Sequence, residues 1–110
     1  MSVSRSDHLY AYVQDVTGEW ETYGQAAQLL GDAPPDGMVV RVAGSTPVGY
    51  RVIEVWDSRT MWEAFRDHRL RPTMRSVGGD GSDSVSSFQD MTVRHAVFSP
   101  DWLPVPKRSR

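Results

Sequence analysis

The sequence predicts an α+β fold: a four-stranded antiparallel sheet whose strands and helices follow the order β-α-β-β-α-β. Two observations carry this prediction. Residues 38–57 contain two strand-like runs separated by a short loop with glycine, serine, threonine and proline, which predicts a hairpin. Helix-like segments flank this hairpin at residues 18–31 and 59–77, and a further strand-like run lies outside each of them.

Residues 49–72, GYRVIEVWDSRTMWEAFRDHRLRP, are the most informative segment. The first half predicts a strand, and side chains alternate across a strand. One face then carries Tyr50, Val52, Glu54 and Trp56, and the other carries Arg51, Ile53, Val55 and Asp57. Both faces hold bulky apolar groups, whereas a sheet covered on one side shows a cleaner alternation of apolar and polar residues. We therefore expect both faces of the sheet to be covered.

The elements before this segment follow from local patterns. Residues 8–16, HLYAYVQDV, are rich in β-branched and aromatic residues and predict the first strand. Residues 18–31 predict a helix, with Trp20, Tyr23, Ala27 and Leu30 at helical spacing and Gly31 at its end. Residues 32–37, DAPPDG, predict a turn. Residues 38–43 predict the second strand, joined to the third by a connection of about four to six residues.

The elements after the third strand are a helix, a loop and a last strand. Ser58 is expected to cap a helix whose apolar stripe is Met61, Phe65, His68 and Pro72. Pro72 either breaks this helix or begins a short second piece that runs to Val77. Residues 78–84 predict a loop and residues 85–98 a long last strand. Residues 1–7 and 99–110 are expected to be loose or arm-like ends of one domain spanning residues 1–110.

Composition excludes several classes of function. With 39% hydrophobic and 24% charged residues, the chain is typical of an ordinary globular protein. The absence of cysteine excludes disulfides, thiolate metal sites and cysteine nucleophiles. A net charge of −2 predicts no attraction to nucleic acid or anionic membranes. Neither a membrane-spanning run nor the apolar core of a signal peptide is visible, so we expect a cytoplasmic protein.

The predicted element order is that of the ferredoxin-like fold, whose two helices cover one face of the sheet. The apolar residues on the opposite face of residues 50–57 then need another cover. The simplest cover is the same face of a second copy, so we expect a homodimer whose two sheets pack against each other as a dimeric α/β-barrel.

The chain resembles the dimeric α/β-barrel superfamily, which contains the antibiotic-biosynthesis-type monooxygenases. The residues that carry the resemblance are GYRVIEVWDS, then Met61, Trp62, Phe65 and the Leu70-Arg71-Pro72 ending, together with the last strand VRHAVF. The resemblance implies the fold more than the function, because the superfamily holds cofactor-independent oxygenases, polyketide cyclases, heme-degrading enzymes and small decarboxylases. The position that ligates heme iron in the heme-degrading branch falls on Arg75, which disfavours that activity.

Glu54 is the sharpest candidate for a catalytic residue. It lies between Val52 and Trp56 on a strand face that should be covered. A buried carboxylate is paired, hydrogen-bonded or protonated, and burial moves its pKa toward the range of a general base. The alternative is a structural role, in which Glu54 forms a cross-strand ion pair with Arg41.

His68 and His95 are the candidate bases. His68 lies on the predicted apolar stripe, where an imidazole could remove a phenolic or α-carbonyl proton. His95 alternates with Met91, Val93 and Val97 on the predicted last strand. A histidine satisfied within the core is the alternative for each, and His8 is either a loose terminal residue or part of a shared pocket.

Aromatic side chains could line a pocket for a flat ligand, or they could be core and interface residues. The candidates for substrate binding are Tyr10, Tyr12, Tyr50, Trp56, Trp62, Phe65 and the cation Arg41.

These observations favour a small enzyme that uses neither metal nor organic cofactor and acts on an aromatic or polyketide-like molecule. The resemblance implies proton abstraction followed by cyclisation or monooxygenation, with His68 or His95 as the base and Glu54 or a tyrosine stabilising the enolate. The alternative is a non-catalytic small-molecule-binding or dimerisation protein of the same fold.

Overall fold

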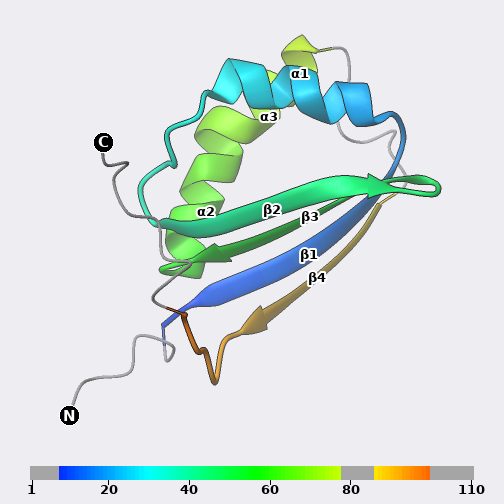
Figure 1. The fold of residues 1–110 in the computed structure, drawn as a ribbon. Helices are drawn as coiled ribbons and strands as arrows, with labels where there is room; N and C mark the ends of the chain where they lie inside the picture. Colours follow the sequence, from blue (N-terminus) through cyan, green and yellow to red (C-terminus); the bar gives the residue numbers. More distant parts are fainter. Residues whose placement is uncertain (1–7, 78–85, 100–110) are drawn as a thin grey trace, which may run out of the picture.

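The computed structural model describes residues 8–77 and 86–99, so the predicted loop at residues 78–84 and most of both predicted terminal segments lie outside the described residues (Figure 1). The strands are β1 (Tyr10–Thr17), β2 (Met38–Thr46), β3 (Gly49–Trp56) and β4 (Ser86–Thr92). The first helix is α1 (Trp20–Leu30). The second helical stretch consists of α2 (Arg59–Phe65), the π-helical turn η2 (Arg66–Leu70) and α3 (Arg71–Ser76).

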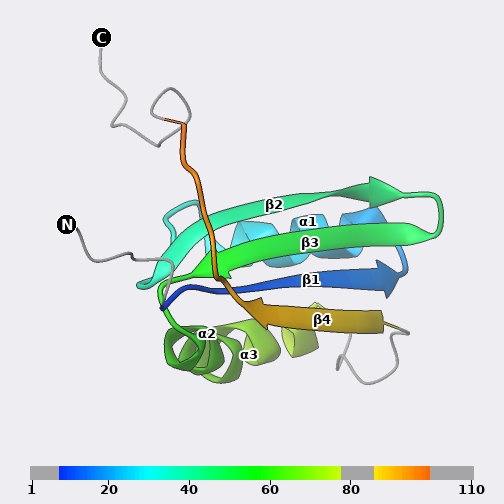
Figure 2. The same ribbon diagram turned by 90° about the horizontal axis from the view of Figure 1, so that it is seen from below.

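The four strands form one sheet in the order β2-β3-β1-β4, and every neighbouring pair is antiparallel. The helices lie on one face of this sheet, and Figure 2 shows the opposite face. The α+β ferredoxin-like fold that the sequence predicts is thereby confirmed.

The β2–β3 hairpin is tighter than predicted. β2 continues to Thr46, which pairs with Gly49, so Pro47 and Val48 alone connect the strands. The predicted connection of four to six residues was therefore wrong, because Gly44 and Ser45 take part in the sheet. A Cβ atom at Gly49 would lie 1.9 Å from the backbone oxygen of Val16, so this close approach of the strands requires glycine.

The face of β3 that carries Tyr50, Val52, Glu54 and Trp56 lies under the helices. In β1 the same face carries Tyr10 and Tyr12, which pair with Trp56 and Glu54 respectively. The main core cluster joins two of these strands to α2 and consists of Tyr10, Tyr12, Trp56, Trp62 and Phe65. A second cluster under α1 consists of Val16, Tyr50 and Val52, with Tyr23 and Ala43 packed against it.

The second helical stretch buries a different face from the one that the sequence predicts. The Ser58 hydroxyl caps it as expected, accepting a hydrogen bond from the Met61 backbone N–H. Its buried residues are Trp62 and Phe65, whereas Met61, His68 and Pro72 are exposed. Trp62 has more apolar surface to bury than Met61, so the helix turns Trp62 inward. The stripe was therefore predicted correctly only at Phe65.

The π-helical turn accounts for the exposure of His68. A π turn contains more residues than an α turn, so three residues after Phe65 the chain has not returned to the buried face. Pro72 then lies in the first turn of α3, as one of the two predicted alternatives had it. Arg69 of the π turn donates a hydrogen bond of 3.1 Å to the Leu30 carbonyl oxygen at the end of α1.

The last strand is shorter than predicted, because β4 ends at Thr92 rather than continuing to Phe98. The chain then turns across the face opposite the helices (Figure 2), where Val93 packs with Leu9 and Ala11. The Val93 N–H donates a hydrogen bond of 2.9 Å to the Leu9 carbonyl oxygen, which fixes this departure. The predicted alternation of His95 with Met91 and Val97 on a strand was therefore wrong.

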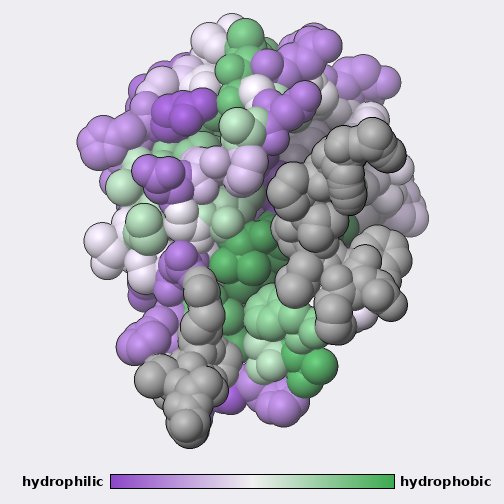
Figure 3. All heavy atoms as spheres, turned by 60° about the vertical axis from the view of Figure 1, so that its left-hand side comes forward, coloured by the Kyte–Doolittle hydropathy of each residue, from purple (hydrophilic) through white to green (hydrophobic). Residues whose placement is uncertain are grey.

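The sheet face opposite the helices keeps exposed apolar side chains within the described residues. They come from three strands and are Val40, Val42, Ile53 and Met91, and the segment after β4 adds Val97 and Phe98. Hydrophobic surface also gathers at the centre of the side of the molecule seen in Figure 3. Both faces of β3 thus carry apolar groups, and within the described residues only the helix-side face is well covered.

Candidate functional site

A partly buried ion pair lies on the helix-side face of the sheet. Glu54 is 2% exposed, and its Oε2 accepts a hydrogen bond of 2.6 Å from Arg41 Nε on the neighbouring strand. Its Oε1 accepts a hydrogen bond of 2.7 Å from the indole N–H of Trp56. Arg41 and Glu54 are direct cross-strand partners, so the ion pair predicted as the structural alternative is present.

The charges of this pair influence each other and their neighbours. Burial lowers the pKa of Arg41, but the charge of Glu54 and the hydrogen bond to it outweigh burial, so the pKa of Arg41 is raised. Burial raises the pKa of the Tyr12 phenol, and the charge of Glu54 and a hydrogen bond to it raise this pKa further. Tyr12 is therefore kept as a neutral hydrogen-bond donor beside the Glu54 carboxylate.

Trp62 places a second indole next to this group. Its Nε1 is buried and has no hydrogen-bond partner among the described residues. The Trp62 N–H nevertheless lies beside the Tyr12 phenol, where a hydrogen bond from it lowers the pKa of Tyr12 against the larger effects of burial and Glu54. Buried donors in native proteins usually have a hydrogen-bond partner, so this N–H keeps the capacity to bond a water or ligand atom.

Aromatic rings surround this donor. The Trp62 ring centroid lies 5.4 Å from that of Tyr10, 5.2 Å from that of Tyr12 and 5.4 Å from that of Phe88. Phe88 comes from the edge strand β4 and is 40% exposed, so the aromatic layer reaches the surface there. Phe88 was not among the predicted site residues, although alternation along the last strand places it on the same face as Tyr12.

The predicted site residues are only partly brought together. The main aromatic core and the ion pair unite Tyr10, Tyr12, Trp56, Trp62, Phe65, Arg41 and Glu54. Tyr50 lies in the other cluster, with Tyr23 and Trp20 as its ring neighbours at 5.5 and 6.3 Å. Glu54 and Tyr50 are thus separated along β3.

Both candidate histidines are exposed. The Nδ1–H of His68 donates to the Ala64 carbonyl oxygen at 3.0 Å, within its own helical stretch. His95 follows the end of β4 and is also exposed. The expectation that His68 faces the sheet was wrong, and neither imidazole belongs to the cluster around Glu54.

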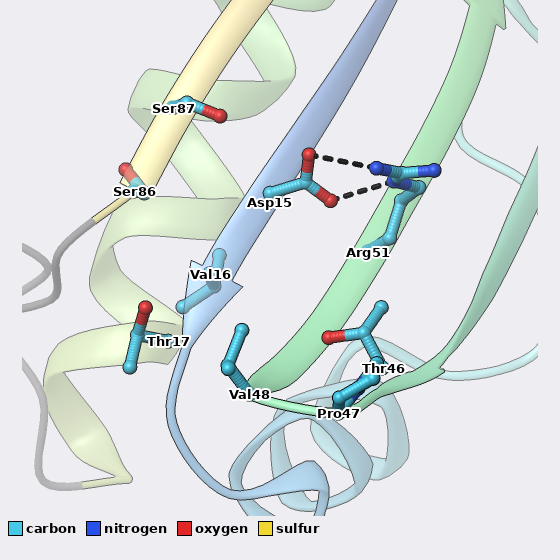
Figure 4. A pocket seen from close by; sticks show the side chains of 9 residues that line it. All are labelled: Asp15, Val16, Thr17, Thr46, Pro47, Val48, Arg51, Ser86 and Ser87. Atoms are coloured by element: carbon cyan, nitrogen blue, oxygen red, sulfur yellow. Dashed lines mark hydrogen bonds and ion pairs between the residues drawn. The ribbon is translucent and has the colours of Figure 1, made fainter.

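Two hollows open at opposite ends of the sheet. The first, of about 450 Å³, lies at the β2–β3 hairpin and is shown in Figure 4. The exposed pair Arg51 and Asp15 lies along its wall, joined by a hydrogen bond of 2.6 Å from Arg51 Nε. The rest of the wall is formed by Val16, Thr17, Thr46, Pro47, Val48, Ser86 and Ser87, so hydroxyl and aliphatic groups line it without any aromatic ring.

The second hollow, of about 330 Å³, lies at the other end of β1. Its lining residues are His8, Leu9, Tyr10, Arg59, Asp90, Met91 and Thr92. The Tyr10 hydroxyl donates a hydrogen bond of 2.7 Å to Asp90 Oδ2. Burial, followed by this hydrogen bond and the charge of Asp90, raises the pKa of Tyr10. Tyr10 therefore belongs both to this hollow and to the aromatic core.

Within the parts of the chain that the structure describes, no group of three histidine, aspartate or glutamate side chains is arranged to hold a metal ion. Among the same residues, no helix is long and apolar enough to cross a membrane.

Comparison with known proteins gives likenesses in structure alone. No protein-family model matches the chain, and no curated protein matches it by sequence. A mutant of SnoaB, a cofactor-independent oxygenase from Streptomyces nogalater, superposes with a TM-score of 0.58 at 14% identity, covering 81% of this chain and 96% of SnoaB. A second SnoaB structure gives a TM-score of 0.54 at 14% identity, covering 81% of this chain and 94% of that one.

A third likeness is to a monooxygenase from the gene ActVA-Orf6 of Streptomyces coelicolor, in complex with the ligand nanaomycin D. Its TM-score is 0.51 at 17% identity, and the match covers 87% of this chain and 96% of that one. At such low identity the likeness concerns the fold. The chain therefore has the same ferredoxin-like fold as these two monooxygenases.

Proposed function

We propose that the protein is a small cofactor-independent enzyme that acts on a flat aromatic or polyketide-like molecule by proton abstraction, followed by monooxygenation or cyclisation. The observation that carries the proposal is the unpartnered Trp62 N–H, buried in an aromatic layer beside the Tyr12 phenol and the Arg41–Glu54 pair. The described activities of SnoaB, a cofactor-independent oxygenase, and of the ActVA-Orf6 monooxygenase support the same kind of chemistry.

In this proposal the Glu54 carboxylate accepts a proton from the substrate, and the substrate becomes an enolate. The net charge of the site does not change, because the negative charge moves from the carboxylate to the substrate while Arg41 stays cationic. A donor aimed at the developing oxyanion stabilises it, and Trp62 Nε1 is the proposed donor.

The enolate then has two possible continuations. Attack on a carbonyl carbon of the same molecule closes a ring without an oxidant. Reaction with O₂ converts a methylene group into a carbonyl, with one oxygen atom entering the product and the other leaving as water. Neither continuation requires a cofactor, since the substrate carbanion itself supplies the electrons.

The test measures oxygen uptake with a hydroxylated anthrone in the presence of a chelator and without added cofactor. We expect uptake above the spontaneous rate, lost in Glu54→Gln and reduced about 10²- to 10³-fold in Trp62→Phe, the usual effect of removing one oxyanion donor. Trp20→Phe is the matched control, since Trp20 stacks on Tyr23 in the other cluster. His68→Ala and His95→Ala test whether either histidine is the base. If turnover is lost in one of these variants but kept in Glu54→Gln, that imidazole is the base and Glu54 is not.

A non-catalytic binding protein is the second candidate, and one observation favours it. Both oxygens of Glu54 already accept hydrogen bonds, from Arg41 and Trp56, so the carboxylate is already engaged within the fold. If neither oxygen uptake nor ring closure occurs while aromatic ligands still bind, the binding function replaces the enzymatic one.

We also propose that the protein is a homodimer that buries the sheet face carrying Val40, Val42, Ile53 and Met91. Light scattering coupled to size-exclusion chromatography should give a mass near twice 12.4 kDa. Ile53→Asp should shift the mass toward that of the monomer, because a charge would enter the interface. A monomer for the unmodified protein would contradict this proposal.

A further inference from the structure

The hollow at the Tyr10 end of β1 has features of a binding site that the proposed reaction does not use. Its volume of about 330 Å³ falls within the range of small-molecule sites. Leu9 and Met91 supply apolar wall, while Arg59 and Asp90 supply one charge of each sign. An arrangement of this kind can hold an aromatic body and orient it through two polar groups.

Both charged groups are held to the same phenol. The Arg59 guanidinium carbon lies 5.7 Å from the centroid of the Tyr10 ring, over its face. Asp90 accepts the hydrogen bond from the Tyr10 hydroxyl through Oδ2. The cation therefore lies over the ring of Tyr10, and the carboxylate lies at its hydroxyl group.

Each charged group keeps capacity for a ligand. Arg59 bonds Glu63 through Nε at 3.1 Å, and no described residue forms a hydrogen bond or ion pair with its two Nη groups. A guanidinium with both Nη groups available is suited to a carboxylate. The second oxygen of Asp90 can accept a hydrogen bond from a ligand hydroxyl.

The hollow adjoins the aromatic core that holds the proposed reaction site through one shared residue, Tyr10. Tyr10 lines it, and the Tyr10 ring lies 5.4 Å from Trp62 and 6.4 Å from Tyr12, centroid to centroid. A ligand seated against Tyr10 would place its polar substituents at Arg59 and Asp90, with its ring system directed along the aromatic layer.

We propose that this hollow binds the carboxylate and a hydroxyl group of an aromatic hydroxy acid. Arg59 pairs with the carboxylate, and Asp90 accepts a hydrogen bond from the hydroxyl group. The proposal rests on the proposed function for the ring system of the ligand and extends it to a substrate class, the anionic hydroxylated aromatics. Arg59 is then a specificity-determining residue.

The test is calorimetric titration of the full chain with 4-hydroxy-2-naphthoate, 4-methoxy-2-naphthoate and 1-naphthol. We expect the hydroxynaphthoate to bind at least about tenfold more tightly than 1-naphthol, which corresponds to a single charge-assisted pair. Arg59→Gln should abolish this preference. Arg71→Gln is the matched control, because Arg71 also forms an exposed i,i+4 pair, with Asp67, away from the hollow.

The methoxy compound tests the proposed contact between the ligand hydroxyl and Asp90, because a methoxy group cannot donate a hydrogen bond. The unmodified protein should bind it several-fold more weakly than the hydroxy compound, and Asp90→Ala should bind the two equally. Backbone amide shifts should fall at residues 8–10, 59 and 90–92. Circular dichroism spectra and melting temperatures establish that each variant is folded.

Three results would overturn the inference: equal affinity for the naphthoate and 1-naphthol, a preference that survives Arg59→Gln, or amide shifts at the hairpin hollow instead. These titrations need no turnover. Selective naphthoate binding without catalysis would support this inference and refute the proposed enzyme. Turnover of uncharged anthrones without carboxylate selectivity would refute this inference and support the proposed enzyme.

Discussion

Trp56 offers the most direct test of the packing described above. It is the one large side chain of the described residues that is completely buried, at 0% exposed, and its ring centroid lies 5.3 Å from that of Phe65. Its indole N–H also holds Glu54. Replacing it by alanine removes both the apolar contact area and this hydrogen bond.

The magnitude follows from the area removed from water. A buried tryptophan removes roughly 200–250 Å², which at about 25 cal/mol per Å² is about 5–6 kcal/mol. Alanine retains a small part of this, and partial collapse of the cavity recovers some more. We therefore expect Trp56→Ala to lower the free energy of unfolding by about 3–5 kcal/mol.

Trp56→Phe separates the two contributions. It keeps most of the ring contact with Phe65 and leaves Glu54 with one donor fewer, which should cost about 1–3 kcal/mol. Trp20→Ala is the surface control: Trp20 is 39% exposed, so its loss should cost no more than about 1–2 kcal/mol.

Urea unfolding followed by far-ultraviolet circular dichroism measures these differences. All variants need the same protein concentration, because association would make the apparent stability depend on it. A loss below about 1 kcal/mol for Trp56→Ala, or one no larger than that of Trp20→Ala, would refute the assignment of Trp56 to the core.

Three further predictions address the ion pair, the hairpin and the buried phenol. Arg41→Met leaves the Glu54 carboxylate buried without its cation and should lower the free energy of unfolding in urea by about 3–5 kcal/mol. The double variant Arg41→Met/Glu54→Gln should lower it by less, because no unpaired charge is then buried. Equal losses for the two variants would argue against the pair. Gly49→Ala should lower the free energy of unfolding by about 1–3 kcal/mol, because backbone atoms occupy the place of its Cβ, while Gly44→Ala, whose Cβ meets nothing within 4 Å, should change the melting temperature little. Burial and Glu54 raise the pKa of Tyr12 above its ordinary 10.0, so the unfolded chain releases this proton at lower pH than the folded chain and stability falls as pH rises above about 10. Tyr12→Phe should make this alkaline fall shallower in unfolding measurements between about pH 8 and 11, and identical slopes would count against it.

The sheet was predictable because its signals are local and repeat along the chain. The alternation along residues 50–57 placed Glu54 on a covered face, and the neighbouring strand offered Arg41 as its partner, as the structure has it. The position of Ser58 before the second helical stretch was likewise sufficient to predict its cap.

The histidines could not be placed in the same way. The exposure of His68 depends on the π-helical turn and on which apolar side chain of α2 is buried. Both features depend on packing against the sheet. The position of His95 depends on where β4 stops. The stop at Thr92 comes with the hydrogen bond from the Val93 N–H to the Leu9 carbonyl oxygen, a contact distant in sequence. Pairings of this kind leave no periodic pattern in the residues themselves.

The contact between Arg69 and the Leu30 carbonyl has a mechanical consequence for the molecule. The last carbonyls of a helix lack partners in their own helix, and here one of them is satisfied by a side chain from the other helical stretch. The two helices are thereby linked across the top of the sheet, with Arg69 also over the Phe65 ring at 6.0 Å. Loosening of either helix should therefore be transmitted to the other, so the layer above Glu54 and Trp62 should open as one cooperative unit, and amide exchange at the end of α1 should accelerate when Arg69 is replaced by alanine.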